Sequence, residues 1–515
     1  MKKKWLCTVL LLGLVALAGC SNTTENQEDE TPMPTKTPAA TATPTVTPTP
    51  TPFVPEVLGV FQAEDAELTG NVKVTKDYVE GFQKAETDTC SFTVQVEKEG
   101  FYDLIFRVAS NGGEKINPVS VDGVGVGDIS VETTHYSESV ISRVWLAPGG
   151  HKVSVGVSWG WIMLDSMTVQ TAEPLPSDLY EVEAKLINPN AGDEAKRLMS
   201  FLTDIYGEKV LSGQYCDDGA FGKEMQVIQN TTGKQPAILG MDLMDYNGVN
   251  QLHGSSMKLP TKVKAFWDKG GIVTLCWHWN TSEEYARNEW WGTFYTDSTK
   301  FNLKKAMSGQ DQAGYDMLMK DIDNIAKPLL EIQEAGIPIL FRPLHEASGG
   351  WFWWGASGPE VYKELWVLLY DKLTNEYGLN NLIWVWNGQA ADWYPGDEYV
   401  DIVGEDIYPG EKVYTSQMTK YLEVASYSTE RKMVYLTENG CIPDPDLLVR
   451  DGAMWGMWGT WSGEFVRKTV GIRAQLSEQY TEEYMMKKAY EHEAVITLDE
   501  MPDLKTYPIS ESFTK

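Results

Sequence analysis

The spacing of hydrophobic and polar residues divides most of the chain into two regions. Between Val57 and about Ala172, apolar and polar residues alternate in short segments that glycine-containing turns separate. Alternation with a period of two is typical of strands that bury one face. The clearest segments are residues 61–64, 91–96, 102–108 and 151–157. This region is therefore predicted to be an antiparallel β-sandwich of roughly 115 residues.

From about Ser177 to the end, apolar runs alternate with stretches that have the spacing of amphipathic helices, such as residues 193–206, 315–335 and 361–377. Eight strand and helix units in one domain predict a (β/α)8 TIM barrel. An open doubly wound sheet is the alternative, but no glycine-rich phosphate loop supports it. The eight apolar runs are residues 209–212, 235–241, 271–277, 338–341, 381–386, 400–404, 433–436 and 453–458.

Carboxylic acids follow the fourth and the seventh of these runs. The fourth run leads into the sequence RPLHEASGGWFWWG at residues 342–355, and the seventh ends in TENG at residues 437–440. The carboxyl ends of barrel strands surround the active-site mouth, so Glu346 and Glu438 are expected to lie close together. Two carboxyl groups beside flat aromatic side chains are the groups needed to break a glycosidic bond.

The start of the chain has the features of an exported bacterial lipoprotein. Lysines at positions 2–4 precede an apolar run at residues 5–17, and LAGC at residues 17–20 resembles a lipoprotein cleavage box. Residues 1–19 are therefore expected to be a signal peptide, and Cys20 the lipid-bearing first residue of the mature chain. An ordinary signal peptide followed by a chance cysteine is the alternative.

A proline-rich segment separates this leader from the folded regions. Residues 20–55 repeat Thr-Pro and contain almost no large apolar side chain, which predicts a disordered linker. The sandwich is then expected at residues 56–173 and the barrel at residues 177–515.

The net charge of the chain limits the kinds of molecule that it is expected to bind. The chain has 43 basic and 73 acidic residues and a net charge of −30. This acidity argues against nucleic acid and favours a neutral polymer over an anionic one.

The other cysteines outside the leader, at positions 90, 216, 276 and 441, are far apart in sequence. They are expected to be buried thiols, although a disulfide between two of the three in the barrel is left open.

The barrel region resembles glycoside hydrolase family 26. The resemblance rests on RPLHE at residues 342–346, WFWWG at 351–355, GEDIY at 404–408 and LTENG at 436–440, with Trp277-His278 on the third run. It implies that Glu346 is the acid/base and Glu438 the nucleophile of a retaining double displacement that needs no cofactor. The two carboxyl groups should then lie roughly 5 to 5.5 Å apart.

The same resemblance implies roles for the residues around this pair. Tyr408 would hold Glu438 by a hydrogen bond, and Arg342 would orient the carboxylates. His345 would bind the sugar near its 2-hydroxyl, which is axial in mannose, and His278 would line the same subsite. The walls of the cleavage subsite would be Trp351 and Trp461.

The sandwich region resembles carbohydrate-binding module family 35, through FQAEDAE at residues 61–67, EGFYD at 99–103 and WGWIMLDSMTV at 159–169. The resemblance implies a structural calcium ion held by Gln62, Glu64 and Asp165. Gln62 and Glu64 are two positions apart and would face the same side of a strand. The family more often has glutamate at the position of Gln62. Trp159 is the expected sugar platform of the module, with Trp145 and Trp161 as other candidates.

The expected protein is a monomeric, lipid-anchored enzyme on the outside of the cell. It would be a retaining endo-β-1,4-mannanase that hydrolyses mannan, galactomannan or glucomannan. A β-1,3-1,4-glucanase or a β-1,3-xylanase on the same barrel is the nearer alternative. A lipid-anchored glycan-binding protein without activity is the more distant one, and the presence of both Glu346 and Glu438 argues against it.

Overall fold

The computed structural model describes residues 53–158, 160–255, 258–471 and 473–514. The expected signal peptide, Cys20, Trp159 and the linker up to Pro52 lie outside the described residues. Among the described residues, no helix has both the length and the apolar character that a membrane crossing requires. These residues contain two hydrophobic cores, one in each of the regions that the sequence pattern predicts.

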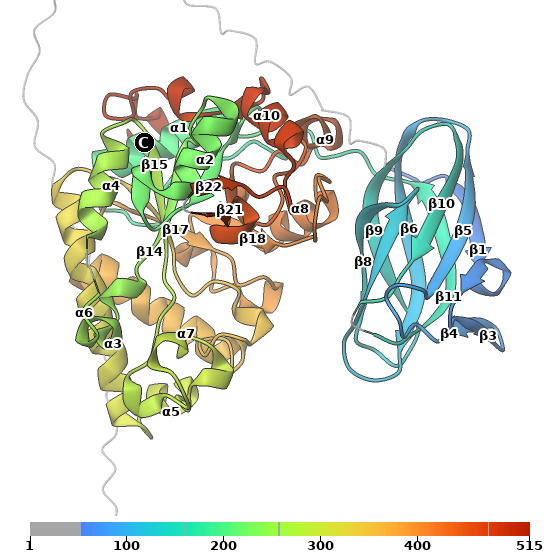
Figure 1. Cartoon of the computed structure of the whole chain (residues 1–515), viewed down its shortest axis with the longest axis horizontal. Helices are drawn as coiled ribbons and strands as arrows, with labels where there is room; N and C mark the ends of the chain where they lie inside the picture. Colours follow the sequence, from blue (N-terminus) through green and yellow to red (C-terminus); the bar gives the residue numbers. More distant parts are fainter. Residues whose placement is uncertain (1–52, 159, 256–257, 472, 515) are drawn as a thin grey trace, which may run out of the picture. The chain divides into compact units, whose positions relative to one another are not determined.

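The first region is an antiparallel β-sandwich (Figure 1). One sheet has the order β3-β4-β11-β6-β9, with β1 also paired to β11, and the other has the order β2-β5-β10-β7-β8. A 3-10 helix, η1 (Ala63–Asp65), follows β1. The strands are β1 (Val57–Gln62), β2 (Glu67–Thr69), β3 (Lys73–Thr75), β4 (Tyr78–Glu80), β5 (Thr89–Val96), β6 (Gly100–Ser110), β7 (Lys115–Val121), β8 (Val124–Val131), β9 (Ser137–Leu146), β10 (Gly149–Val155) and β11 (Ile162–Thr171).

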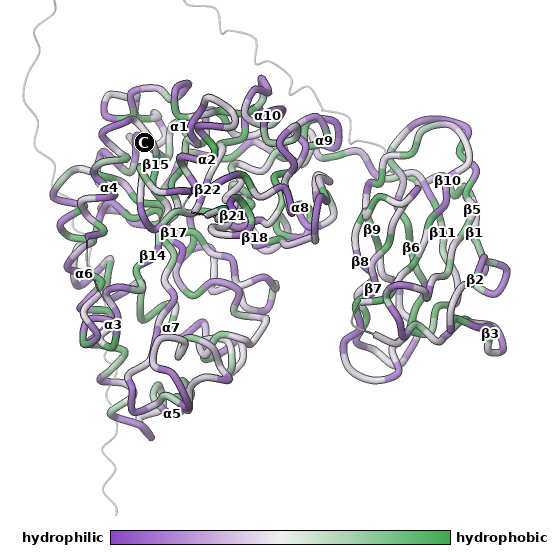
Figure 2. The backbone as a smooth tube through the Cα atoms, viewed as in Figure 1, coloured by the Kyte–Doolittle hydropathy of each residue, from purple (hydrophilic) through white to green (hydrophobic). Residues whose placement is uncertain are grey.

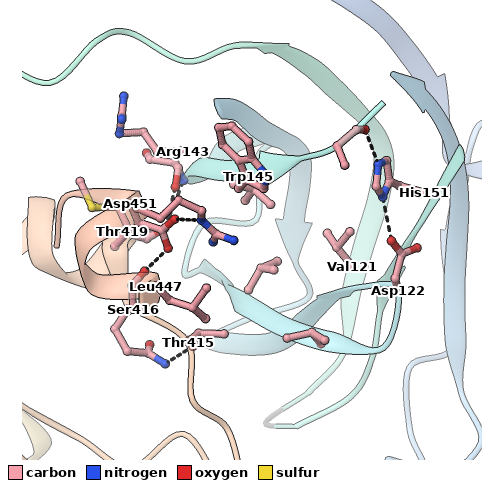
Figure 3. A pocket seen from close by; sticks show the side chains of 18 residues that line it. Val121, Asp122, Arg143, Trp145, His151, Thr415, Ser416, Thr419, Leu447 and Asp451 are labelled. Carbon is pink, nitrogen blue, oxygen red and sulfur yellow. Dashed lines mark hydrogen bonds and ion pairs between the residues drawn. The ribbon is translucent and has the colours of Figure 1, made fainter. Parts of the chain in front are cut away.

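Alternating side chains of the two sheets form the core of the sandwich. Along β6, Leu104 and Phe106 are fully buried, whereas Ile105 between them is partly exposed. Hydrophobic and hydrophilic residues both occur along the strands of this region (Figure 2). On β10, His151 places Nδ1 2.7 Å from the Asp122 carboxylate and Nε2 2.8 Å from the Ala147 carbonyl oxygen (Figure 3).

The second region is a closed barrel of eight parallel strands, which confirms the predicted TIM fold. In order around the barrel the strands are β13 (Gly213–Tyr215), β14 (Ile238–Asp242), β15 (Ile272–Cys276), β16 (Ile339–Arg342), β17 (Leu382–Trp386), β18 (Ile402–Ile407), β19 (Val434–Asn439) and β20 (Trp458–Thr460). Outside the barrel, β12 (Val210–Leu211) pairs with β23 (Val495–Ile496), and β21 (Arg467–Val470) pairs with β22 (Arg473–Leu476).

Helices of very different length connect these strands (Figure 1). The described α-helices are α1 (Asp193–Ile205), α2 (Lys223–Thr232), α3 (Gly248–Leu252), α4 (Leu259–Trp267), α5 (Leu303–Met307), α6 (Gln312–Glu334), α7 (Pro359–Tyr370), α8 (Met418–Ala425), α9 (Pro445–Asp451) and α10 (Glu483–Glu491). The three helices expected from sequence correspond to α1, α6 and α7, and a π-helical turn, η8 (Asp371–Glu376), extends α7.

The first barrel strand differs from the prediction. The apolar run at residues 209–212 contains β12, which lies outside the barrel, and the barrel begins one step later with β13. Hydropathy does not mark β13, because its buried side chains include polar groups. Gln214 donates a hydrogen bond to the carbonyl oxygen of Trp461, and the hydroxyl of Tyr215 accepts one from Arg342. The last strand, β20, likewise begins only where its predicted run ends.

Most of the tryptophans in the barrel region serve packing. Nine of those in the barrel region expose less than 2% of their surface: Trp277, Trp279, Trp353, Trp354, Trp366, Trp384, Trp386, Trp455 and Trp458. Trp351, in contrast, is 46% exposed, so its indole is available to a ligand.

Candidate active site

Glu346 and Glu438 meet at the carboxyl ends of the barrel strands. Glu438 lies on β19, the seventh strand, and Glu346 lies just beyond β16, the fourth. One carboxylate oxygen from each of Glu346, Asp406 and Glu438 lies within 4.8 Å of the others. This separation agrees with the short distance of a retaining pair and is well below the roughly 6.5 to 9.5 Å that an inverting pair needs for its water.

Glu438 is held by a cation and a hydroxyl. Its Oε1 accepts a hydrogen bond from Arg342 Nη2, and its Oε2 accepts one of 2.6 Å from the hydroxyl of Tyr408. Arg342 is fully buried and also donates to Asp406, at 2.8 Å. Charge-assisted bonds of this kind favour the ionised form of an acid. Arg342 and Tyr408 thus hold Glu438 in place and favour its carboxylate form, and the hydrogen bond expected from Tyr408 is present.

Glu346 has a different set of partners. Among the described residues, its side chain accepts one hydrogen bond, from Trp351 Nε1 to Oε2, at 2.9 Å. Its backbone has left-handed angles, with φ 53° and ψ 32°, immediately before the 3-10 helix η7 (Ala347–Gly349). This conformation is uncommon for a residue with a side chain and is typical of functional sites, where the surrounding structure holds it.

The surrounding charges give the two glutamates different pKa values. Burial and the neighbouring carboxylates of Asp406 and Glu438 raise the pKa of Glu346 well above its ordinary value. Burial and Asp406 also raise the pKa of Glu438, but Arg342 and the Tyr408 hydroxyl oppose this increase. The pKa of Glu346 is therefore the higher of the two, so the proton shared by the pair resides on Glu346.

The two histidines lie side by side. His345 Nε2 is 3.3 Å from His278 Nε2, and the ring centroids are 4.6 Å apart. Only 1% of His345 is exposed, compared with 9% of His278. The His345 ring is therefore buried, and its contact with a sugar hydroxyl stays a prediction. His278, whose Nδ1 lies 2.5 Å from the carboxylate of Asp242, is the more accessible of the two rings.

Arg342 lies among carboxylates and other buried acceptors. Its guanidinium is fully buried and donates to Tyr215, Asn387, Asp406 and Glu438. Every one of these partners lies on or directly after a barrel strand. No nitrogen of this group is therefore left facing a ligand.

Aromatic side chains border the carboxylate pair. Trp351 lies next to Glu346 through the hydrogen bond of its indole. Trp461, the residue after β20, has its ring 4.7 Å from that of Tyr215 and 5.8 Å from that of His278, measured between centroids. Both tryptophans therefore lie where a sugar ring above the carboxylates can pack against them.

Two residues of this cluster, Asn387 and Tyr215, were not predicted from the sequence. Asn387 directly follows the fifth strand, so the strand-end argument that found Glu346 applies to it too. Tyr215 was missed because the first strand was placed too early. A third member, Asp242, lies at the end of the second strand, where its carboxylate bonds the ring and the backbone N–H of His278.

The four described cysteines are free and buried, as expected, and no disulfide joins any two of them. The Cys276 thiol lies with Asp242 and His278 in one group whose ligand-type atoms are within 4.8 Å of one another. Burial raises the pKa of Cys276 well above its ordinary value. The thiol is therefore protonated, and the hydrogen bond between Asp242 and His278 accounts for the close approach of the other two groups.

The candidate calcium residues of the sandwich do not form the arrangement expected. Gln62 ends β1, but Glu64 lies in η1, so strand alternation does not bring their side chains to one face. The Asp165 carboxylate is occupied by an ion pair with Arg107, at 2.8 Å, and by the hydroxyl of Ser166. Only Glu64 fits a cation, because its Oε2 is buried without a hydrogen-bond partner among the described residues.

Comparisons with known proteins agree with these features. Residues 187–490 match glycosyl hydrolase family 26, and residues 58–172 match carbohydrate binding module family 35. A mannan endo-1,4-beta-mannosidase of Thermothelomyces thermophilus is 36% identical over 452 residues, which cover 86% of this chain and 90% of that protein.

Two solved structures are similar to this chain. The GH26-CBM35 β-(1,4)-mannanase of Podospora anserina has a TM-score of 0.62 at 34% identity, over 88% of this chain and 99% of that one. A β-mannanase from a symbiotic protist of the termite Reticulitermes speratus, in complex with a gluco-manno-oligosaccharide, has a TM-score of 0.56 at 33% identity, over 62% of this chain and 98% of that one. The chain therefore belongs to glycosyl hydrolase family 26, a family of retaining enzymes that need no cofactor for catalysis, and carries a family 35 carbohydrate-binding module.

Proposed function

We propose that this protein is a retaining endo-β-1,4-mannanase that hydrolyses mannan, galactomannan or glucomannan. The observation that carries the proposal is the pair Glu346 and Glu438, whose carboxylate oxygens approach within 4.8 Å but whose hydrogen-bond partners differ. The first holds a proton and the second a negative charge, which are the states that a double displacement requires at its start.

The reaction takes place in two steps. In the first, Glu438 Oε attacks the anomeric carbon while Glu346 protonates the leaving glycosidic oxygen. This step neutralises the nucleophile, so the charge that raised the pKa of Glu346 is lost. In the second, Glu346 takes a proton from water, the water oxygen attacks the anomeric carbon, and Glu438 leaves as a carboxylate. The configuration at the anomeric carbon is retained.

The substrate is inferred from the relatives and from the charge. The three similar proteins described above are mannanases, and one of them is in complex with a gluco-manno-oligosaccharide. A net charge of −30 suits a neutral polysaccharide. Mixed-linkage β-1,3-1,4-glucan and β-1,3-xylan are the competing substrates on the same barrel.

Release of reducing ends from locust bean gum, barley β-glucan and β-1,3-xylan tests the proposal. We expect the first to be cleaved, and Glu346→Ala and Glu438→Ala each to lose roughly 10³-fold or more in kcat/KM. Azide should partly restore the Glu346→Ala variant when the substrate carries a good leaving group. Activity that survives in Glu438→Ala would exclude this nucleophile, and cleavage of glucan or xylan alone would overturn the substrate. Absence of hydrolysis with retained binding would leave a glycan-binding protein.

We also propose that the protein is a lipid-anchored monomer on the outside of the cell. The basic and apolar leader, the LAGC sequence at residues 17–20 and the Thr-Pro stretch support this. Expression in a bacterial host should give a membrane-bound form that Cys20→Ser releases. A Cys20→Ser protein that stays on the membrane would contradict the anchor, and light scattering of the released protein would test the monomer.

For the module, we propose binding of β-mannan at Trp159 and a calcium ion at Gln62, Glu64 and Asp165. The orphaned Glu64 oxygen supports a cation, whereas the ion pair between Arg107 and Asp165 opposes it. Calcium should raise the unfolding temperature relative to EDTA in the natural protein but not in Glu64→Gln. An equal response of the two proteins to calcium would contradict the calcium site. Unchanged mannan binding by Trp159→Ala would contradict the role of Trp159 as the sugar platform.

A further inference from the structure

Asp242, His278 and His345 form a line of side chains across three neighbouring barrel strands. Asp242 ends β14, His278 follows β15, and His345 follows β16. The Asp242 Oδ2 atom lies 2.5 Å from His278 Nδ1, and His278 Nε2 lies 3.3 Å from His345 Nε2. The line links a carboxylate outside the reacting pair to a ring beside that pair.

The carboxylate of Asp242 is fixed by backbone groups. Its Oδ1 accepts hydrogen bonds from the N–H of Met244, at 2.8 Å, and of His278, at 3.0 Å. Its side chain and that of His278 are each only 11% exposed. A carboxylate that accepts from two backbone N–H groups cannot rotate freely, so its Oδ2 determines where the proton on His278 Nδ1 lies.

The proton positions along the line follow from the charges. Burial lowers the pKa of His278, but the charge and hydrogen bond of Asp242 and the charge of Glu438 outweigh it, so the pKa is raised overall. Burial, Arg342 and His278 lower the pKa of His345 well below its ordinary value. His278 is therefore the charged ring, and its Nε2–H donates to the Nε2 of a neutral His345.

Several ionisable groups act on this imidazolium. Negative charge comes from Asp242 on β14 and Glu438 on β19, and positive charge from Arg342 on β16. Asp217, in the segment after β13, also interacts with His278, and burial together with Asp242 raises its pKa to about 6. His345 and the Cys276 thiol are the neutral members of the group.

We propose that Asp242 is a positioning residue that holds His278 as an imidazolium against His345, so that a fixed positive charge faces the nucleophile Glu438. The inference rests on the proposed function, because it assigns a second cation, after Arg342, to the nucleophile of that reaction. Asp242 does not touch the substrate and acts only through the ring of His278.

The direction of a pH shift distinguishes this role from a direct effect of charge. If Asp242 acts through His278, Asp242→Asn leaves the ring neutral, Glu438 loses a neighbouring cation, and its pKa rises. If the Asp242 charge acts on Glu438 directly, its removal lowers the pKa of Glu438. The acid limb of kcat/KM reports the ionisation of the nucleophile in the free enzyme. The two cases therefore move this limb in opposite directions.

The test combines kinetics with titration of the ring. We expect Asp242→Asn to move the acid limb upward by about 0.5 to 1 pH unit. His278→Gln should move it upward by a similar amount, and the double variant no further than His278→Gln alone. Histidine-selective ¹⁵N labelling is practical because the chain has six histidines, and His278→Gln assigns the signal. The His278 ring should be an imidazolium at neutral pH in the natural protein and neutral in Asp242→Asn.

Asp321→Asn is the matched control. Asp321 is also a buried carboxylate that accepts from a backbone N–H and a ring, those of Gly248 and Trp279, but it does not contact His278. It should destabilise the protein without moving the acid limb. A downward or absent shift in Asp242→Asn, or a neutral His278 in the natural protein, would overturn the proposal. The ring titration needs no substrate, so it decides the charge of His278 even if the proposed hydrolysis fails.

Discussion

At the scale of single residues, the two glutamates differ because of what surrounds them. Arg342 and Tyr408 donate to Glu438, whereas the indole of Trp351 is the donor at Glu346. A carboxyl group with a cation and a hydroxyl as partners ionises first, and a buried one beside negative charge ionises last. The same residue type is thus prepared for two roles by its neighbours.

The pH dependence of kcat/KM should follow from this difference. Activity requires Glu438 ionised and Glu346 protonated, so kcat/KM should fall below the pKa of Glu438 and above the raised pKa of Glu346. A glycoside with a good leaving group needs no proton from the acid. In Glu346→Gln with this substrate, the alkaline limb should disappear while the acid limb stays. An alkaline limb that persists in this variant would show that another group supplies the proton.

Tyr408→Phe removes one donor from the nucleophile. The lost hydrogen bond, 2.6 Å long, is to a charged group and is worth about 1.5 to 3 kcal/mol, so kcat/KM should fall roughly 10- to 100-fold. The pKa of Glu438 should rise with this loss, and the acid limb should move upward. Tyr414→Phe removes a hydroxyl that bonds Glu482 instead and should leave the limb in place. Equal kinetics of the two variants would contradict the role of Tyr408.

At the scale of elements, the loop between β16 and α7 places the acid/base. Glu346 and Leu344 both have left-handed backbone angles, with φ of 53°. Such a loop is kept in shape by its packing and not by local preference. At Gly355 the packing is very close, since a Cβ atom there would lie 1.9 Å from the carbonyl oxygen of Ala347, the neighbour of Glu346.

Gly355→Ala should therefore damage both stability and catalysis. The clash is with backbone and cannot be relieved by a side-chain movement, so we expect a loss of about 3 kcal/mol in the free energy of unfolding. Displacement of the adjoining Glu346 should lower kcat roughly 100-fold. Gly358→Ala is the control, because its φ is +87° but no atom lies within 4 Å of the added Cβ. Its angles, φ 87° and ψ 171°, strain an alanine by about 1 to 3 kcal/mol, but no clash displaces Glu346, so kcat should change little. Equal activities of the two would contradict the importance of this contact.

At the scale of the whole molecule, the net charge of −30 acts on the choice of polymer. A surface of one sign repels a polymer of the same sign, and salt screens that repulsion. Carboxymethylated galactomannan should therefore have a higher KM than unmodified galactomannan of similar chain length at low salt. The ratio of the two KM values should fall as sodium chloride is added. A ratio that does not change with salt would mean that steric hindrance, and not charge, causes the difference.

The sequence by itself determined the fold class and the reacting pair. Period-two alternation separated the sandwich from the barrel, and residues placed at strand ends located Glu346 and Glu438. These features are local, because burial of one face and the end of a strand each leave a mark within a few residues. The first barrel strand was not predicted because its buried side chains Gln214 and Tyr215 are polar and hydrogen-bonded, so hydropathy does not mark them.

Only the tertiary structure decided how charge is distributed in the site. It buried Arg342 between Asp406 and Glu438, placed the ring of His345 beneath the surface beside His278, and joined Asp242 to His278. It also showed that β1 ends before Glu64. The physical reason is that ionisation and contact depend on groups far apart in sequence, such as Arg342 and Glu438, which are 96 positions apart. No periodicity along the chain reports such pairs, because barrel closure brings them together.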